Sequence, residues 1–202
     1  NKPDAIEALR AASSDEPDIE IVPLKVKYPQ GAEKMLIDAI FHKEVPAGGL
    51  PLDIAILVNS VATTAALADL LDRGVPLIER IVTVTGPAVA RPRNLMVPLG
   101  TPVSAVIEHC GGLLPDAHQV VLGGPMMGKV IAAGSQPVTK TTSGIIVLPS
   151  NHNVIRDKQR SLDQMRFIGK SACTQCSRCT DLCPRYLIGH DLKPHRIMRH
   201  LA

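Results

Sequence analysis

Aromatic residues are nearly absent from this 202-residue chain, which has no Trp, two Tyr and two Phe. Proteins that bind single-stranded nucleic acids stack the bases on aromatic side chains, so this scarcity argues against such a partner. No run of apolar residues approaches the ~18 that a membrane-spanning helix needs. The N-terminus also lacks a charged start followed by an apolar stretch, so no secretory signal is visible. We therefore expect a protein that binds no nucleic acid and has no membrane span.

Net charge is also small, at +3, but it is unevenly distributed along the chain. Residues 151–202 carry 10 Lys/Arg and 4 Asp/Glu, whereas residues 1–150 carry 12 and 15. The basic part surrounds a run of cysteines. Positive charge beside these cysteines favours an anionic thiolate-bound cluster or an acidic docking partner over a nucleic acid.

Four of the five cysteines lie within eleven residues: Cys173, Cys176, Cys179 and Cys183, with Pro184 directly after the last. The spacing C-x2-C-x2-C-x3-C-P is typical of bacterial ferredoxins, which use it to hold a 4Fe–4S cluster. A structural zinc site is the alternative, although zinc thiolates usually come as two pairs separated by a longer insert. Clustered cysteines in a chain without a secretory signal favour metal over disulfides. We predict that these four cysteines bind iron in a reducing compartment.

The role of Cys183 stays open at this point. In two-cluster ferredoxins the fourth cysteine of the run ligates the other cluster. Cys183 therefore either completes the cluster of its own run or joins a second motif, which is not found before Ala202.

The fifth cysteine and three histidines near the C-terminus have simpler explanations than metal binding. Cys110 lies on the apolar face of a predicted helix, so we expect a buried small hydrophobe. His190, His195 and His200 are five residues apart and do not share a helix face. We expect solvated side chains rather than metal ligands.

The first part of the chain has the alternating pattern of an α/β domain. Apolar spacing predicts helices over residues 1–12, 32–40 and 61–71. Short apolar runs predict strands near residues 19–26 and 53–58. Alternating strands and helices indicate an α/β layer.

Two of these helices begin with residues that suit an anion or a cofactor. Gly31 and Glu33 stand at one start, and Asn59 and Ser60 at the other. Helix N-termini present free backbone N–H groups to such ligands. From the residues alone, simple N-capping is the favoured explanation of the same residue types.

The middle of the chain predicts a β-grasp module. Strands over residues 81–85 and 94–99 form a hairpin, and a helix over 101–109 follows it. Further strands are predicted over 120–122 and 144–148. Two strands, a helix and more strands in a short segment are the pattern of this fold.

A glycine-rich segment in this module, Gly123–Lys129, matches the letters of a P-loop, G-x-x-x-x-G-K. The next residue is Val130 instead of the Ser or Thr that holds magnesium, and Pro125 removes one backbone donor. We expect a tight glycine turn between strands.

Six blocks of sequence resemble one family. Four are similar to the C subunit of the Rnf electron-transport complex: Lys27–Ile37, Val58–Thr63, Val82–Gly86 and Gly123–Gly128. Two more, Thr139–Gly144 and Cys173–His190, are similar to PduS, the cobalamin reductase of propanediol-utilising microcompartments. More distantly, the blocks resemble the flavin-bearing 51 kDa subunit of respiratory Complex I.

The resemblance implies a multi-domain α/β chain with three parts. Residues 1–78 are expected to form a partial FMN- and NADH-binding α/β domain of the Complex I 51 kDa type. Residues 79–149 are expected to be a β-grasp (SLBB, soluble-ligand-binding) domain with a return strand. Residues 150–202 are expected to be a linker and a ferredoxin-like, α-helical 4Fe–4S segment.

The resemblance also implies an NADH-dependent flavin and iron–sulfur oxidoreductase subunit. Gly31 and Glu33 match the family's G-x-E block on the flavin side. Asn59 and Thr63 match its V-N-x-V-x-T block, and Ser60 lies between them. The family's glycine-rich flavin loop is expected before Asn1 and its second cysteine motif after Ala202, so we expect this fragment alone to be inactive.

Partners and location follow from the same resemblance. Other electron-transfer subunits or a corrinoid-dependent enzyme system would be the partners. The protein would be cytoplasmic, either peripheral to the inner membrane or inside a bacterial microcompartment. The resemblance leaves the terminal electron acceptor open between the partners of an Rnf complex and a corrinoid. A non-redox β-grasp module that binds a ligand or partner and carries structural zinc is the alternative.

Overall fold

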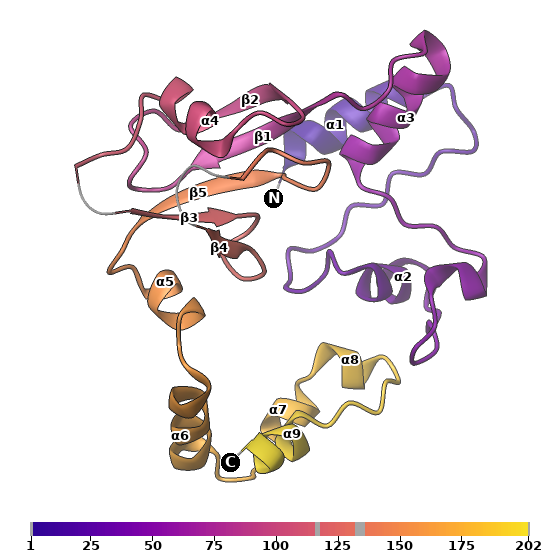
Figure 1. The fold of residues 1–202 in the computed structure, drawn as a ribbon. Helices are drawn as coiled ribbons and strands as arrows, with labels where there is room; N and C mark the ends of the chain where they lie inside the picture. The colour runs from indigo at the N-terminus through magenta and orange to yellow at the C-terminus, as the bar shows by residue number, and fades with distance from the viewer. Residues whose placement is uncertain (1, 116–117, 132–135, 202) are drawn as a thin grey trace. The chain divides into compact units, whose positions relative to one another are not determined.

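The computed structural model describes residues 2–115, 118–131 and 136–201. The chain divides into two compact units, one of Asn1–Val58 with Arg166–Ala202 and the other of Asn59–Met165. The five strands found among the described residues all lie in the second unit, and the described part of the first is built from helices and loops (Figure 1).

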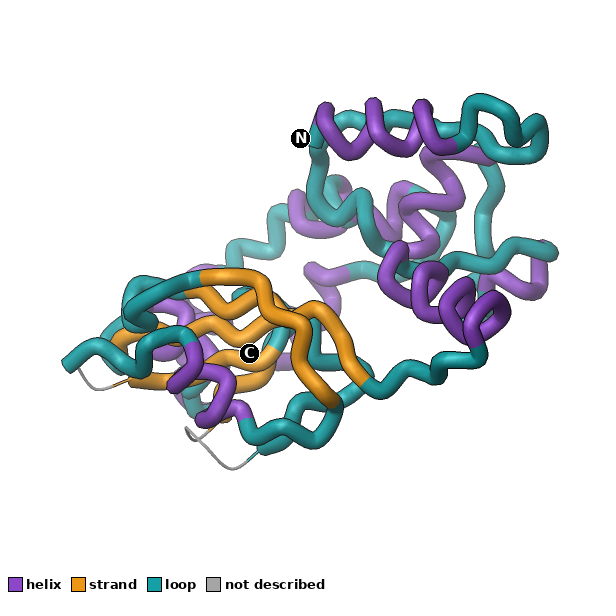
Figure 2. The backbone as a smooth tube through the Cα atoms, turned by 90° about the horizontal axis from the view of Figure 1, so that it is seen from above, coloured by secondary structure: helices purple, strands orange, loops and turns teal. Residues whose placement is uncertain are grey.

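The second unit is built on a mixed five-stranded sheet with the order β2-β1-β5-β3-β4. Its strands are β1 (Glu79–Thr85), β2 (Arg93–Pro98), β3 (His118–Leu122), β4 (Lys129–Ile131) and β5 (Gly144–Pro149). Strand β1 pairs antiparallel with β2 and parallel with β5, and β3 pairs antiparallel with both β4 and β5. The strands lie together, coloured orange in Figure 2. Strand β5, the last in the sequence, is therefore the central strand that joins the two hairpins.

Alternation along the strands sends neighbouring side chains to opposite faces. Helix α4 (Val103–His109) packs on one face, in a buried cluster that includes Val82, Val84, Val103, Val106, Ile107, Cys110, Val120, Ile145 and Val147. Helix α5 (Asn153–Lys158) supplies Ile155, which packs with Val121 and Leu148 in a second cluster. The β-grasp prediction is confirmed, and so is the prediction that Cys110 is buried.

The turn after β1 admits no side chain. Gly86 has φ +117°, and a Cβ built there would clash with the carbonyl oxygen of Val147 and lie 2.8 Å from its backbone nitrogen. Both atoms are inside van der Waals contact, so glycine lets β5 pass close to the end of β1.

The P-loop-like segment is a tight turn between β3 and β4, as expected, with Leu122 paired to Lys129. A Cβ at Gly128 would lie 2.6 Å from the Leu122 carbonyl oxygen. The Lys158 ammonium donates to the carbonyls of Met126 and Gly128, at 2.9 and 2.8 Å. The turn thus offers carbonyl oxygens to a cation, whereas a P-loop offers N–H groups to a phosphate.

The remaining elements are helices. The first unit holds α1 (Pro3–Ala12), α2 (Glu33–Phe41), the 3-10 helix η1 (Pro51–Ile54), α7 (Arg178–Asp181), α8 (Pro184–Leu187) and α9 (Pro194–Leu201). Helix α3 (Val61–Arg73) begins the second unit, and α6 (Leu162–Ala172) crosses the boundary between the two units. The three helices expected before residue 78 are confirmed, except that the expected start at Asn1 lies outside the described residues.

The strands expected near residues 19–26 and 53–58 are wrong. The first segment is irregular, and the second begins in η1 and continues without regular structure. A strand needs a neighbour for its backbone hydrogen bonds, and the described residues of the first unit contain no strand. Ile19 and Leu57 are accordingly exposed, at 53% and 70%. The mixed α/β class is nevertheless confirmed by the sheet and the helices together.

Candidate functional site

The cysteine run lies on a loop and two short helices that follow α6. Cys173 opens the loop, Cys179 belongs to α7, and Cys183 directly precedes α8. Gln175 and Ser177 have left-handed backbone conformations, with φ of 57° and 59°. Residues in this region reverse the local direction of the chain, so the loop curls around its own interior.

The curled loop forms one side of a cavity of about 230 Å³. Three of the predicted ligands, Cys173, Cys176 and Cys179, line this cavity. The rest of its wall consists of Ala172, Thr174, Gln175, Ser177, His195 and Met198. Cys183 is not on the wall. The structure therefore brings three of the four thiols to one space.

The arrangement of the thiols can be compared with that of a single-ion site. Within the residues that the structure describes, no three Cys, His, Asp or Glu side chains are close enough to hold a single metal ion. A tetrahedral zinc site needs its thiolate sulfurs at ~2.3 Å from one ion. In a cuboidal cluster each thiolate binds a different iron, so the ligands stand farther apart. Among the described residues, the three thiols thus line one cavity without forming a preformed single-ion site.

Gln175 places a hydrogen-bond donor beside these sulfurs. Its Nε2 donates to the Cys173 Sγ at 3.1 Å. Its Oε1 is buried and has no hydrogen-bond partner among the described residues. Hydrogen bonds to sulfur help set the potential of iron–sulfur clusters. Sequence reasoning missed Gln175, although its place between two of the cysteines was a signal.

Helix α9 contributes His195 and Met198 to the wall of the same cavity. It packs closely on α6 at Gly169, where a Cβ would lie 3.3 Å from the Met198 Cε. Thr180 is buried, and its hydroxyl oxygen lies 2.7 Å from His195 Nδ1. The structure therefore shows His195 half-buried and hydrogen-bonded, not solvated as expected.

The other two histidines differ from each other. His190 is also half-buried, and its Nε2 donates to the Val45 carbonyl at 3.1 Å. The expectation of a solvated ring is therefore wrong for His190 as well, because the ring is bonded to the backbone of the loop that contains Val45. His200 is exposed, as the sequence predicted.

Cys183 has an environment of its own. It is half-buried and is the N-cap residue of α8, in which Pro184 takes the first helical position. Its backbone N–H donates to the Thr180 carbonyl at 3.0 Å. Proline at that position fixes the direction in which the chain leaves the cysteine run.

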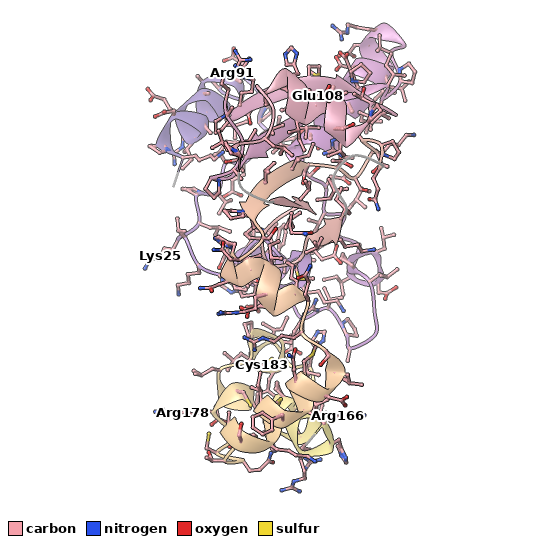
Figure 3. All side chains as sticks on the ribbon, turned by 60° about the vertical axis from the view of Figure 1, so that its left-hand side comes forward. Lys25, Arg91, Glu108, Arg166, Arg178 and Cys183 are labelled. Carbon is pink, nitrogen blue, oxygen red and sulfur yellow. The ribbon has the colours of Figure 1, made fainter. Side chains whose placement is uncertain are left out.

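Positive charge surrounds the cysteine helices. Residues 166–202 carry seven Lys/Arg and two Asp/Glu. One of these acids, Asp191, pairs with Lys193 at 2.5 Å, and the hydrogen bond from Lys193 lowers the pKa of Asp191. Arg178, beside Cys179, is exposed (Figure 3). Such a field favours an anionic group or an acidic partner.

Gly31 and Glu33 lie at the entry to α2, in the first unit. No side chain caps this helix, and nothing lies within 4 Å of a Cβ built at Gly31. Glu33 is exposed, whereas the next residue, Lys34, is buried and donates to the Pro46 carbonyl at 3.2 Å. The entry to α2 is therefore open at the two predicted positions.

Asn59, Ser60 and Thr63 lie at the start of α3, in the second unit. The Ser60 hydroxyl accepts from the Thr63 N–H at 3.2 Å and lies 2.9 Å from the Thr63 hydroxyl. Ser60 is thus a true N-cap, and the capping explanation is confirmed for it. Asn59 is exposed.

Ser60 and Thr63 also line a larger cavity of about 610 Å³ within the second unit. Arg80 on β1 contributes a guanidinium that donates to the Lys140 carbonyl, while its Nε is buried without a partner among the described residues. Arg73 lines the same cavity and pairs with Asp69 at 3.0 Å. No sequence pattern predicted this basic lining, because its residues come from distant parts of the chain.

Three family domains match the chain in succession. Residues 1–69 match the Nuo51 FMN-binding domain, residues 81–130 the SLBB domain, and residues 172–202 the 4Fe-4S dicluster domain. Within the described residues, no helix is long and apolar enough to cross a membrane.

Whole-chain relatives agree with these domains. The C subunit of the proton-translocating ferredoxin:NAD(+) oxidoreductase complex of Clostridium ljungdahlii is 40% identical over 187 residues, which is 93% of this chain and 38% of the relative. Its counterpart in the Na(+)-translocating complex of Acetobacterium woodii is 39% identical, over 93% of this chain and 40% of the relative. Cobalamin reductase PduS of Citrobacter freundii is 40% identical, over 85% of this chain and 38% of the relative. The chain thus spans about two fifths of the length of these curated relatives.

Proposed function

The chain belongs to the RnfC/PduS family, and from this we propose that it is part of a subunit that passes electrons between NADH, FMN and 4Fe–4S clusters. One observation carries the proposal most: Cys173, Cys176 and Cys179 surround one cavity inside the segment that matches the dicluster domain. The Gln175 hydrogen bond to Cys173 supports it further, because hydrogen bonds to sulfur help set the potential of iron–sulfur clusters.

The residues around the cavity have distinct tasks in this proposal. FMN supplies the step between the two-electron hydride of NADH and the one-electron chemistry of the clusters. Cys173, Cys176 and Cys179 would hold one cluster as thiolates, and Met198 would lie at the wall of its cavity. The nearby arginines and lysines offset the negative charge of the site.

Cys183 is proposed to serve a second cluster. It does not line the cavity of the other three cysteines, and its run has the spacing in which the fourth cysteine ligates the other cluster. The match to a dicluster domain supports this assignment.

The flavin side of the proposal involves Gly31, Glu33, Asn59, Ser60 and Thr63. All five lie within the segment that matches the Nuo51 FMN-binding domain. The first turn of α3 leaves backbone N–H groups that attract a phosphate, and Ser60 and Thr63 line the 610 Å³ cavity beside it. These residues would orient the flavin in the complete protein.

Partners and location are proposed from the same relatives. The Clostridium ljungdahlii relative is named as a subunit of a ferredoxin:NAD(+) oxidoreductase complex. The Citrobacter freundii relative is named as a cobalamin reductase. We propose other electron-transfer subunits or a corrinoid-dependent enzyme system as partners. The location would be cytoplasmic, peripheral to the inner membrane or inside a microcompartment.

Anaerobic reconstitution of the chain with iron and sulfide tests the proposal. We expect a visible thiolate-to-iron absorbance band that bleaches on reduction. Cys176→Ala should abolish the band, whereas Cys110→Ala, which removes the buried thiol at the end of α4, should keep it. Bound zinc without acid-labile sulfide would instead support a non-redox β-grasp module with a structural metal.

A further inference from the structure

His195 brings a ring nitrogen to the wall of the cavity lined by Cys173, Cys176 and Cys179. The ring does not hang freely from α9. Its Nδ1 lies 2.7 Å from the hydroxyl oxygen of Thr180, the residue that follows Cys179 on α7. The backbone N–H of His195 points to the same oxygen, at 3.4 Å. One hydroxyl therefore holds both the backbone and the ring of His195.

Hydrogen-bond accounting at Thr180 decides which ring nitrogen carries the proton. A hydroxyl has one proton to donate and two lone pairs that accept. The backbone N–H of His195 uses one lone pair, and Thr180 is only 4% exposed. Among the described residues its proton has no acceptor other than His195 Nδ1, and a buried hydroxyl proton without an acceptor is costly. The Thr180 hydroxyl therefore donates to Nδ1, and the neutral ring carries its own proton on Nε2.

The remaining N–H of the ring is then free to act in the cavity. Nε2 has no hydrogen-bond partner among the described residues, and the His195 side chain lines the cavity. We propose that Thr180 fixes His195 in the Nε2–H form, and that this N–H donates to a sulfur of the cluster and raises its reduction potential. The proposal rests on the function proposed above, because it needs a cluster in this cavity.

The sign of the effect follows from charge. Reduction adds one electron to an already anionic cluster, so an N–H that points to its sulfur stabilises the reduced form more than the oxidised form. His195 acts on the cluster directly, and Thr180 is a positioning residue. Removal of either group should lower the midpoint potential without removing a ligand.

The first test uses the metal-free chain. Nitrogen-15 NMR of the imidazole should show the Nε2–H form for His195 in the natural chain and in Thr180→Ser, which keeps the hydroxyl. Thr180→Val has nearly the same shape but no hydroxyl, and it should show a mixture of ring forms. An unchanged His195 spectrum in Thr180→Val would overturn the positioning role.

The second test is a redox titration of the reconstituted chain, followed by electron paramagnetic resonance. We expect the equilibrium constant for reduction to fall about tenfold in Thr180→Val and His195→Leu, which is about 59 mV for one electron. Thr180→Ser should retain the natural potential, and His195→Gln, which keeps an N–H donor, should retain part of it. His200→Leu, an exposed position on the same helix, is the matched control and should change nothing.

The outcomes separate this inference from the proposed function. A cluster that forms in every variant with one common potential overturns the role of His195 alone. If no variant forms a cluster, and the natural chain forms none, the proposed function fails and the inference fails with it.

Discussion

The sheet of the second unit and the cysteine helices of the first are stabilised by different means. The strands of the sheet carry aliphatic side chains that are completely buried, among them Val82, Val84, Ile145 and Val147. In residues 166–201 the buried positions are Gly169, Thr180 and Ile188, and helices α7 and α8 have four residues each. The sheet thus has an apolar core of its own. Residues 166–201, the cysteine segment, lack such a core.

This difference indicates what the cysteine segment depends on. Segments shorter than about 40 residues usually need disulfides, metals or association to fold, and this one shares a compact unit with Asn1–Val58. All five cysteines are free thiols here, so no disulfide stabilises the segment. Metal binding to thiolates contributes directly to folding free energy where no preformed core exists. We expect the cluster to act both as electron carrier and as the main source of stability for this segment.

The largest expected effect concerns the cysteines themselves. Cys176→Ala should abolish cluster binding, because Cys176 lines the cavity. Cys183→Ala should keep a cluster in that cavity, since three thiolates remain around it. Iron and acid-labile sulfide per chain measure both variants. Equal and complete loss in the two would show that Cys183 completes the same cluster.

A glycine substitution should disrupt the sheet and leave the cysteine segment intact. Gly86→Ala forces a Cβ against the Val147 carbonyl oxygen, and we expect it to lower the free energy of unfolding by about 3 kcal/mol. Gly100→Ala is the matched control: its φ is also positive, at +90°, but nothing lies within 4 Å of the new Cβ. It should cost about 1 kcal/mol. Denaturant titration, followed by circular dichroism, measures both, and equal costs would contradict the close approach of β5.

Thiol reactivity should distinguish the two regions in the metal-free chain. Burial raises the pKa of Cys110, whose side chain is fully buried, while Cys176 is exposed. Burial hinders access to Cys110 and lowers its thiolate content, so we expect Cys110 to be alkylated more than about tenfold more slowly than the exposed Cys176. Mass spectrometry of iodoacetamide-treated chain at intervals gives the two rates. Comparable rates would mean that the sheet opens as readily as the cysteine segment.

The smallest effect is expected at the exposed Asp191–Lys193 pair. The pKa of Asp191 is lowered in the folded chain from its ordinary value of 3.8, first by the hydrogen bond from Lys193. A lowered carboxyl pKa contributes stability that is present above about pH 4 and is lost as pH falls through the folded value. Carbon-13 NMR titration of the Asp191 carboxyl should show a lower midpoint than in Lys193→Gln. The same midpoint in both chains would contradict the pairing.

The sequence predicted the second unit well, because its signals are local. Alternation over residues 81–85, the turn at Gly86 and the burial of Cys110 all depend on near neighbours in the chain. The strands expected near residues 19–26 and 53–58 failed because a strand depends on a partner elsewhere.

The cysteine site was predicted in part. Its spacing pointed to Cys173, Cys176 and Cys179, which the structure gathers on one cavity. Spacing could not reveal that α9 returns to bring His195 and Met198 to the same wall. That contact depends on Gly169 and Thr180, two residues with no motif of their own.

Hydrogen exchange before and after reconstitution tests the central claim most directly. The claim is that the sheet folds on its own core, whereas the cysteine segment depends on its cluster. Amides of β1, β3 and β5 should exchange slowly in both states, and those of residues 173–201 should be protected only after iron and sulfide are bound. Equal protection of residues 173–201 without the cluster would contradict the account.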